Sequence, residues 1–504
     1  MAFHCHVLIL SPIHCINEAR IYMHRLIQKY KQLSLMTKAS LWFVFCNLLQ
    51  KGISVITVPI FTRLLSTTEY GTYNIYLSWF NILTIFTSLY LYYGVFNNAL
   101  NRIKSSAEKD IYISSMQGLI TTLICALTII YLPLRSFWSN LLGLSQTALW
   151  LMIIHLWVEP CIQFWLAKQR FEFKYTHAVI ITLVKSFLNP ALGLFLVLTA
   201  NYDKALARII SVVISEVIIA GTIMILQFYK GKTFYHKEYW KYALAFNIPL
   251  LPHYLSMVVL AQADRVMIQN YAGMSKVGIY SLAYSIGLLV QLFTNAINNS
   301  LTPWTYDKLN RKDYGSIRKT TNTLLLLLTI ITFCMLLFTP EIVKLFGSEE
   351  YYEAIYVVPP VACSVFFIFL YNIFAIPQMY FERQKFMSIA STLAAVLNII
   401  LNYIFIKLYG YIAAGYTTVA CYLAYSIGHY IFSRRVCMER IGNMDLFDSR
   451  AILFISMFVL LCSVGFNFTY QFTLLRYIVF GIIVIGIVIK RDVIIGIIRR
   501  IRKK

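Results

Sequence analysis

The sequence predicts an all-α polytopic membrane protein with about fourteen transmembrane helices. Of its 504 residues, 59% are hydrophobic and only 13% are charged, whereas soluble domains are about 45–50% apolar and about 25% charged. The apolar residues come in repeated long runs, and a run of about 20 spans a hydrocarbon layer of roughly 30 Å as a helix. These runs do not alternate polar and apolar residues over about 10 positions, which excludes a transmembrane β-barrel.

The apolar runs place the expected helices in order along the chain. They lie at residues 40–62, 74–99, 114–133, 147–167, 176–199, 206–228, 243–270, 279–303, 321–339, 353–378, 387–407, 411–432, 451–470 and 474–490.

The loop charges give an independent test of this order. With the N-terminus in the cytoplasm, segments on that side, counted with the helix ends that border them, hold 33 of the 44 Lys and Arg residues, and the opposite segments, counted in the same way, hold 9; Lys51 and Lys185 lie deeper within helices. Because cytoplasmic loops carry the excess of Lys and Arg, both termini are predicted to be cytoplasmic. The same placement explains the net charge of +23 without a nucleic-acid partner.

A weak internal repeat predicts two similar halves. The segment "RLLSTTEYGTYNIYLSW" follows the first helix and "NYAGMSKVGIYSLAYSI" follows the seventh, with Gly71 and Gly278 in register at an offset of 207 residues. The offset spans six helices, an even number, so both halves keep one orientation, as in transporters built from parallel repeats. The predicted domains are a cytoplasmic segment at 1–37, six-helix lobes at 38–232 and 241–435, two further helices at 451–490 and a basic cytoplasmic tail at 491–504.

The first 35 residues stand outside this pattern. "HVLILSPIHCINEARIYMHRLIQKY" predicts a short strand, a polar loop and an amphipathic helix. It faintly resembles the opening of a GT-B glycosyltransferase, but there is no room for the rest of such a domain. We interpret it as a non-catalytic leader or an over-extended start, with Met36 as a natural start for the membrane part.

Polar side chains share a face on several predicted helices, which indicates a hydrated cavity. A Lys or Arg at mid-helix costs about 2.5–3.5 kcal/mol on insertion scales, so such residues usually face a water-filled cavity or a partner. With more cations than anions, the cavity should attract an anion. The candidate substrate-binding residues are Lys51, Arg63, Lys185, His253, Arg265, Asn47, Gln291, Asn295 and Asn298, and the candidates for ion coupling are Glu159, Glu216 and Asp264.

Structural alternatives exist for these residues. Lys51 would pair with a Glu across the bundle, Lys185 would neutralise Glu159, and His253 would be a hydrogen-bonded core residue. Asp264 and Arg265 would only anchor a helix end at the outer interface, and the Asn residues of the eighth helix would join helices.

Absent motifs limit the chemistry. There is no GxxxxGK[ST] sequence for ATP hydrolysis, no HExxH, no GxSxG and no CxxC or metal-ligand spacing. The expectation is therefore a transporter with no catalytic residue, no cofactor and no metal site.

Three segments resemble the polysaccharide-biosynthesis flippases of the multidrug/oligosaccharidyl-lipid/polysaccharide exporter superfamily. They are "NLLQKGISVITVPIFTRLLSTTEYGTYNIY", "IPLLPHYLSMVVLAQADRVMIQNYAGMSKVGIYSLAYSIG" and "LNIILNYIFIKLYGYIAAGYTTVACYLAYSI". The resemblance covers about residues 38–490 and implies a V-shaped, MATE-like pair of six-helix lobes.

The resemblance also implies a function. The expected substrate is an undecaprenyl-diphosphate-linked oligosaccharide, an O-antigen, capsule or exopolysaccharide repeat unit, flipped from the cytoplasmic to the outer leaflet of the bacterial inner membrane by alternating access. The expected partners are this lipid-linked glycan and membrane lipids, with a polysaccharide polymerase and a chain-length regulator as further partners. The last two helices would hold the polyprenyl tail in a side groove, as in lipid II flippases.

Three rival functions fit the sequence less well. An ion-coupled multidrug exporter of the same superfamily should have an acidic cavity, and this one is predicted to be cationic. A membrane polymerase or ligase needs a large outer loop with catalytic residues, and no outer loop here much exceeds a dozen residues. A scaffold without transport does not explain the internal repeat.

Overall fold

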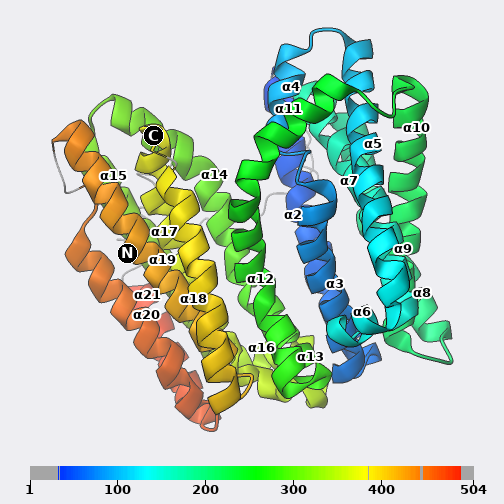
Figure 1. Ribbon diagram of the computed structural model, residues 1–504. Helices are drawn as coiled ribbons and strands as arrows, with labels where there is room; N and C mark the ends of the chain where they lie inside the picture. Colours follow the sequence, from blue (N-terminus) through cyan, green and yellow to red (C-terminus); the bar gives the residue numbers. More distant parts are fainter. Residues whose placement is uncertain (1–31, 33, 384, 443–445, 490–504) are drawn as a thin grey trace, which may run out of the picture.

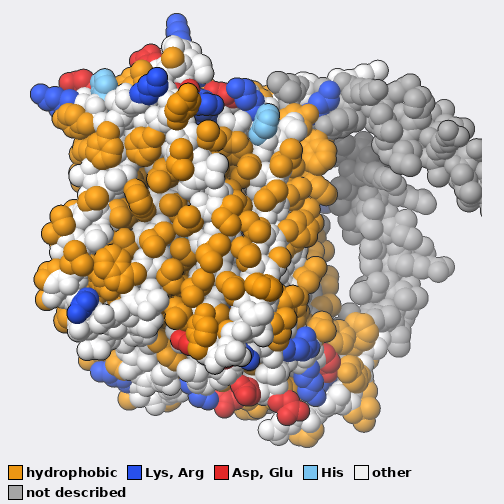
Figure 2. Space-filling view, turned by 90° about the vertical axis from the view of Figure 1, so that its right-hand side faces the viewer, with side chains coloured by type: hydrophobic (Ala, Val, Ile, Leu, Met, Phe, Trp, Pro, Cys, Tyr) orange, Lys and Arg blue, Asp and Glu red, His pale blue; other side chains and the backbone are white. Residues whose placement is uncertain are grey.

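The computed structural model describes residues 32, 34–383, 385–442 and 446–489, and within these ranges the regular secondary structure is helical, without strands. Among the described residues, eleven helical segments are long and apolar enough to cross a membrane, and each of the fourteen predicted segments overlaps at least one helix. Figure 2 shows hydrophobic side chains over the middle of one face and charged ones gathered towards its two ends. The predicted fold class is confirmed; most of the predicted N-terminal segment at 1–37 and the whole predicted tail at 491–504 lie outside the described residues.

The first bundle, called the first lobe, occupies the right of Figure 1. Its helices are α2 (Leu35–Leu64), α3 (Thr67–Ser88), α4 (Gly94–Arg102), α5 (Ser106–Tyr131), α6 (Arg135–Leu142), α7 (Gln146–Phe171), α8 (Tyr175–Thr199), α9 (Lys204–Glu216) and α10 (Thr222–Gly231), with short helical turns at η1 (Leu132–Leu134) and η2 (Val217–Gly221).

The second bundle, called the second lobe, packs around α17, whose side chains are nearly all buried. Its helices are α12 (Leu251–Ala272), α13 (Met274–Gly287), α14 (Leu289–Asn310), α15 (Tyr314–Leu337), α16 (Thr339–Phe346), η4 (Glu349–Tyr356), α17 (Val358–Tyr380), α18 (Lys385–Tyr409) and α19 (Ala413–Ile441). Two more helices, α20 (Ser449–Thr469) and α21 (Thr473–Ile489), follow, and α20 packs on α15 and α17.

The seventh predicted span is broken, and only its second part packs within the second lobe. α11 (Lys237–Asn247) packs on α5 and α4, whereas α12 packs on α18 and α3. The turn η3 (Ile248–Leu250) between them contains Pro249, which lacks the backbone N–H that a continuous helix needs. The chain therefore crosses from one lobe to the other at this break.

A quoted motif has a local structural role. Ser66 in "RLLSTTEYG" accepts a hydrogen bond from the backbone N–H of Glu69, and the Glu69 carboxylate accepts one from the N–H of Ser66. This capping box satisfies donors that would otherwise be unpaired at the start of a helix. It fixes the corner between α2 and α3 and so positions Gly71 two residues later.

Candidate functional site

The two lobes touch most closely where α3 and α13 begin. A Cβ atom built on Gly71 would lie 2.0 Å from the carbonyl oxygen of Met274, and one built on Gly278 would lie 2.0 Å from that of Thr67. Both pairs repeat at the offset of 207 residues that the sequence predicted. The Thr67 hydroxyl also lies 2.8 Å from that of Ser275. We call this region the shut end, because backbones here approach too closely for a side chain to intervene.

At the far end of α3, two broken helices meet. α3 ends at Ser88, and the next two residues, Leu89 and Tyr90, have positive φ angles of 47° and 48°. The side-chain amide of Asn247, the last residue of α11, donates to the carbonyl oxygen of Leu89 at 2.8 Å. Two consecutive non-glycine residues in the left-handed region are strained, and such strain concentrates at functional sites.

A tyrosine cluster lies at this meeting point. Tyr90 and Tyr93 follow the end of α3, and Tyr254 belongs to α12 of the second lobe. Ring centroids are 5.1 Å apart for Tyr90–Tyr93, 5.2 Å for Tyr90–Tyr254 and 6.3 Å for Tyr93–Tyr254. Tyr93 is 53% exposed, and among the described residues the hydroxyls of all three have no hydrogen-bond partner. The cluster offers ring faces and free hydroxyls between the lobes.

Of the predicted basic residues, Lys51 is exposed on α2 and has no ion-pair partner within the described ranges. Asn47, one turn earlier, is exposed as well. Arg265 is only 8% exposed; it donates to Ser281 Oγ at 3.1 Å and stacks over the ring of Tyr284 at 4.4 Å. No carboxylate pairs with Arg265 in the part of the chain that is described, so its charge is not cancelled by a direct ion pair.

Lys185 is neutralised, and its partner is Glu216 rather than Glu159. The Lys185 Nζ lies 2.8 Å from a Glu216 carboxylate oxygen, and Glu216 is 2% exposed. The π-helical turn η2 starts directly after Glu216; such turns are frequent at functional sites. Glu159 accepts from Gln163 at 2.7 Å through one oxygen, while its other oxygen is buried and has no partner among the described residues.

Asp264 is held by neutral donors from three helices. It is 1% exposed, and it accepts hydrogen bonds from the Tyr280 hydroxyl at 2.6 Å, the Asn402 amide at 2.6 Å and the Thr418 hydroxyl at 2.7 Å. Asp264 and Arg265 lie two turns before α12 ends at Ala272, so they are buried within the second lobe rather than exposed at a helix end.

The remaining predicted residues are spread over the second lobe and the shut end. His253 shares a 2.9 Å hydrogen bond with Ser391. Gln291, Asn295 and Asn298 are half-buried along α14. Arg63 donates to the carbonyl oxygen of Leu345 at 2.9 Å, which places it at the shut end, far along α2 from Lys51.

The sequence-based reasoning missed two features. Arg208 is buried on α9, bonded to Asn189 Oδ1 at 2.9 Å and stacked over Phe61 at 4.2 Å. The sequence also did not predict the tyrosine cluster, although "SLYLYYG" carries a visible signal: consecutive aromatic residues before a glycine, inside the predicted helix at 74–99.

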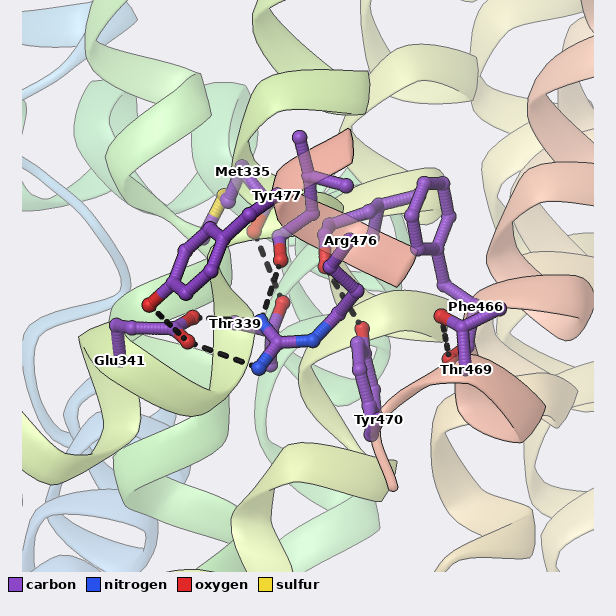
Figure 3. Close-up of polar contacts among 10 residues, drawn as sticks. Met335, Thr339, Glu341, Phe466, Thr469, Tyr470, Arg476 and Tyr477 are labelled. Atoms are coloured by element: carbon purple, nitrogen blue, oxygen red, sulfur yellow. Dashed lines mark hydrogen bonds and ion pairs between the residues drawn. The ribbon is translucent and has the colours of Figure 1, made fainter. Parts of the chain in front are cut away.

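A largely apolar cavity lies beside the last two helices. Its volume is about 490 Å³, and its walls come from α15, α20 and α21, including Phe333, Phe458 and Phe466. The lining cation Arg476 is 3% exposed and bonded bidentately to Glu341 at 2.7 and 2.8 Å (Figure 3). The cavity therefore offers hydrocarbon walls and an internally paired charge.

Comparisons with known proteins agree with this architecture. A family model described as "Polysaccharide biosynthesis protein" matches residues 36–307, and one described as "MatE" matches residues 249–404. "Lsg locus putative protein 1" of Haemophilus influenzae is 24% identical over 165 residues, which cover 31% of this chain and 40% of that protein. An "Uncharacterized membrane protein" of the same organism is 24% identical over 224 residues, which cover 42% and 53%. The chain thus spans about half or less of the curated relatives it matches.

Solved structures share the fold over most of the chain. "Lipid II flippase MurJ, inward closed conformation" has a TM-score of 0.68 at 17% identity and covers 91% of this chain and all of its own. A multidrug resistance MATE family transporter in an inward-facing conformation gives 0.63 at 14% identity, covering 78% and 96%. An outward-facing conformation of a MATE family transporter gives 0.50 at 14% identity, covering 82% and 99%.

Proposed function

Since the chain belongs to the polysaccharide biosynthesis protein family, we propose that it flips a polyprenyl-diphosphate-linked oligosaccharide across the bacterial inner membrane. The cargo would be an O-antigen, capsule or exopolysaccharide repeat unit, moved from the cytoplasmic to the outer leaflet by alternating access. The observation that carries this proposal is the meeting of two broken helices at Leu89 and Asn247, where the chain crosses between the lobes. Discontinuous helices at a repeat interface are the usual substrate sites of such transporters.

The diphosphate headgroup would be met by cations that no carboxylate cancels. Lys51 is exposed and unpaired among the described residues, and Arg265 is bonded only to neutral groups there. A Lys or Arg contact with phosphate is a charge-assisted hydrogen bond and is strengthened where water is excluded. Lys185 adds no net charge because Glu216 neutralises it.

The glycan would contact the tyrosine cluster and the amides of α14. Tyrosine offers a flat apolar face and a polar hydroxyl, which suits a sugar ring with its C–H bonds on one side and hydroxyls on its edge. Gln291, Asn295 and Asn298 add amide donors and acceptors on the second lobe. The polyprenyl tail would use the largely apolar cavity between α15, α20 and α21.

Ion coupling would use Asp264 or Glu159 rather than Glu216. Glu216 already has a cation at 2.8 Å. Asp264 is surrounded by neutral oxygen and amide groups, and Glu159 keeps one buried oxygen without a partner in the described ranges. A buried carboxylate without a cation is a costly arrangement unless a proton or another cation binds it.

The direct test is flipping by the purified full chain in liposomes. A fluorescent polyprenyl-diphosphate oligosaccharide is reconstituted on both leaflets, and a membrane-impermeant reductant quenches only the outer one. The protein should raise the quenched fraction from about half to nearly all, and Lys51→Met should slow this about tenfold, whereas Lys104→Met, at an exposed lysine of the loop between α4 and α5, should not. Equal rates with and without protein would refute the proposal.

A cellular test addresses direction and partners. Deleting the gene should trap lipid-linked repeat units on the cytoplasmic side and leave a polysaccharide polymerase and chain-length regulator without substrate. Arg265→Ala should abolish surface polysaccharide while the protein still inserts. Normal surface polymer in the deletion strain would contradict the proposed role.

A second candidate function is ion-coupled multidrug export, favoured by the match of residues 249–404 to the MatE model. It predicts that the same liposomes accumulate a cationic dye under a sodium or proton gradient. Dye accumulation without flipping of the lipid-linked glycan would favour this alternative.

A further inference from the structure

At the shut end, each lobe extends a short loop helix onto the other lobe. α6 of the first lobe and α16 of the second are both eight residues long, and each is followed by a glycine, Gly143 or Gly347. Their last residues are Leu142 and Phe346. The backbone carbonyls at the end of a helix lack an intrahelical partner, so both loop helices present an acceptor that needs a donor.

The two acceptors are satisfied by donors from the opposite lobe. The Thr62 hydroxyl of α2 donates to the carbonyl oxygen of Phe346 and also lies 3.0 Å from the carbonyl oxygen of Val58 in its own helix. The Gln269 side-chain amide of α12 donates to the carbonyl oxygen of Leu142 at 3.0 Å. Thr62 and Gln269 are 207 residues apart, which is also the offset between Gly71 and Gly278. The same contact is therefore made twice, once in each direction across the lobe interface.

The surroundings are built for these contacts. Thr62 is fully buried. A Cβ atom on Gly143 would lie 1.8 Å from the Gln269 amide nitrogen, and Gly143 has a φ of 63°, so only glycine leaves room for that side chain without strain. Partial negative charge at a helix C-terminus also favours a donor at both acceptors.

The contact from α16 has further support. Arg63 donates to the carbonyl oxygen of Leu345 at 2.9 Å, and the Tyr351 hydroxyl of η4 lies 3.0 Å from the carbonyl oxygens of both Leu65 and Ser66. α16 is itself tied to α21 through Glu341, which pairs with Arg476 and accepts from the Tyr477 hydroxyl at 3.2 Å (Figure 3).

We propose that Thr62 and Gln269 are positioning residues of a reciprocal latch that holds the shut end closed. Each fixes the helix corner of its own lobe to the loop helix of the other, so the α3–α13 contact cannot open until both hydrogen bonds are released. The proposal concerns lobe opening, and it holds whichever substrate the protein carries.

The test measures opening of the purified full chain in lipid nanodiscs, without substrate. Ser275→Cys places a thiol in the α3–α13 contact, and its rate of labelling by a water-soluble maleimide is followed by mass spectrometry of the peptide that contains it. Thr62→Val and Gln269→Met are made in this background, singly and together. Thr57→Val is the matched control, because Thr57 on the same helix bonds only to Ser54 of its own helix.

Each single variant should label about fivefold faster, the factor expected for losing a net hydrogen bond of about 1 kcal/mol. Because the two sites share no partner, the labelling rate of the double variant should rise by about the product of the two single-variant factors. Labelling of the double variant at the Thr57→Val rate would overturn the latch. If one variant fails to fold, the other acts from the opposite lobe and still decides the question. If these variants label faster but the protein does not flip the lipid-linked glycan, the proposed function is rejected and the latch is retained.

Discussion

Gly71 of α3 and Gly278 of α13 face each other across the lobe interface, each packed against the backbone that precedes the other. Their missing side chains leave space for the carbonyl oxygens of Met274 and Thr67, respectively, at 2.0 Å from the positions that Cβ atoms would take. Small residues let membrane helices approach closely, so that van der Waals contact holds them together.

Substituting either glycine should prevent the shut end from closing. Gly71→Ala or Gly278→Ala forces the backbones apart, because the obstructing atoms are main-chain carbonyls that cannot rotate away. We expect flipping to fall at least tenfold while the protein still inserts, and maleimide labelling of a Cys at position 275 to rise. Gly428→Ala is the control, because nothing lies within 4 Å of a Cβ atom there; an equal loss in that variant would mean that helix propensity, not the interface, is responsible.

The tyrosine cluster should determine how tightly the protein binds the glycan part of its substrate. Tyr93→Ala removes an exposed ring and should raise the substrate concentration for half-maximal flipping several-fold, whereas Tyr93→Phe keeps the ring and should restore most of it. The measurement is the liposome assay with lipids that carry one, two or four sugars. If Tyr93→Ala impaired flipping of the bare polyprenyl diphosphate as much as flipping of the lipid with the longest glycan, the cluster would not be a sugar site.

The Lys185–Glu216 pair should be more important for stability than for binding. Glu216→Gln leaves Lys185, a partly buried cation, without its counter-charge, and breaking a fully buried pair from one side costs about 3–5 kcal/mol, which is the upper bound here. Lys185→Met together with Glu216→Leu should recover much of this loss. Thermal unfolding in detergent measures both variants, and a double variant as unstable as the single one would show that the pair has another role.

Asp264→Asn should uncouple transport from its ion gradient. The asparagine still accepts from some of the neighbouring donors, so the fold should hold, but the charge that would bind a cation or proton is lost. Downhill flipping should persist while the gradient no longer accelerates it. The comparison is the initial flipping rate with and without a sodium or proton gradient; a retained gradient effect would transfer the role to Glu159.

The Glu341–Arg476 contact should weaken in acid. Partial burial raises the pKa of Glu341, but the hydrogen bonds from Arg476, the backbone and Tyr477, together with the positive charge of Arg476, outweigh it, and the net effect lowers the pKa from its ordinary value of 4.5. A carboxyl whose pKa is depressed on folding stabilises the protein above its unfolded value and loses that contribution as the pH falls below about 4.5. The fall in melting temperature between pH 6 and pH 4 should be smaller in Glu341→Gln than in the parent protein, and equal falls would contradict this assignment.

The sequence predicted the class of fold and the order of its helices, because both follow from local properties. Long apolar runs such as 176–199 must cross the bilayer as helices, since no other backbone arrangement satisfies its polar groups there. The repeat was also visible, and the register of Gly71 with Gly278 is the register of the actual contact. Breaks were missed where the run stayed apolar: the interval from Leu89 to Tyr93 has no proline, and its conformation is imposed by neighbours such as Asn247.

For individual side chains, hydropathy shows which polar groups enter the membrane, whereas pairing among them depends on the folded arrangement. Lys185 and Lys51 look alike in the sequence, yet Glu216 neutralises the first and the second is unpaired within the described residues. Likewise, Arg63 was predicted to bind substrate, but its contact with Leu345 lies at the shut end. The physical reason is distance: hydropathy is a sum over neighbours in the chain, whereas an ion pair or a latch joins atoms that only folding brings together.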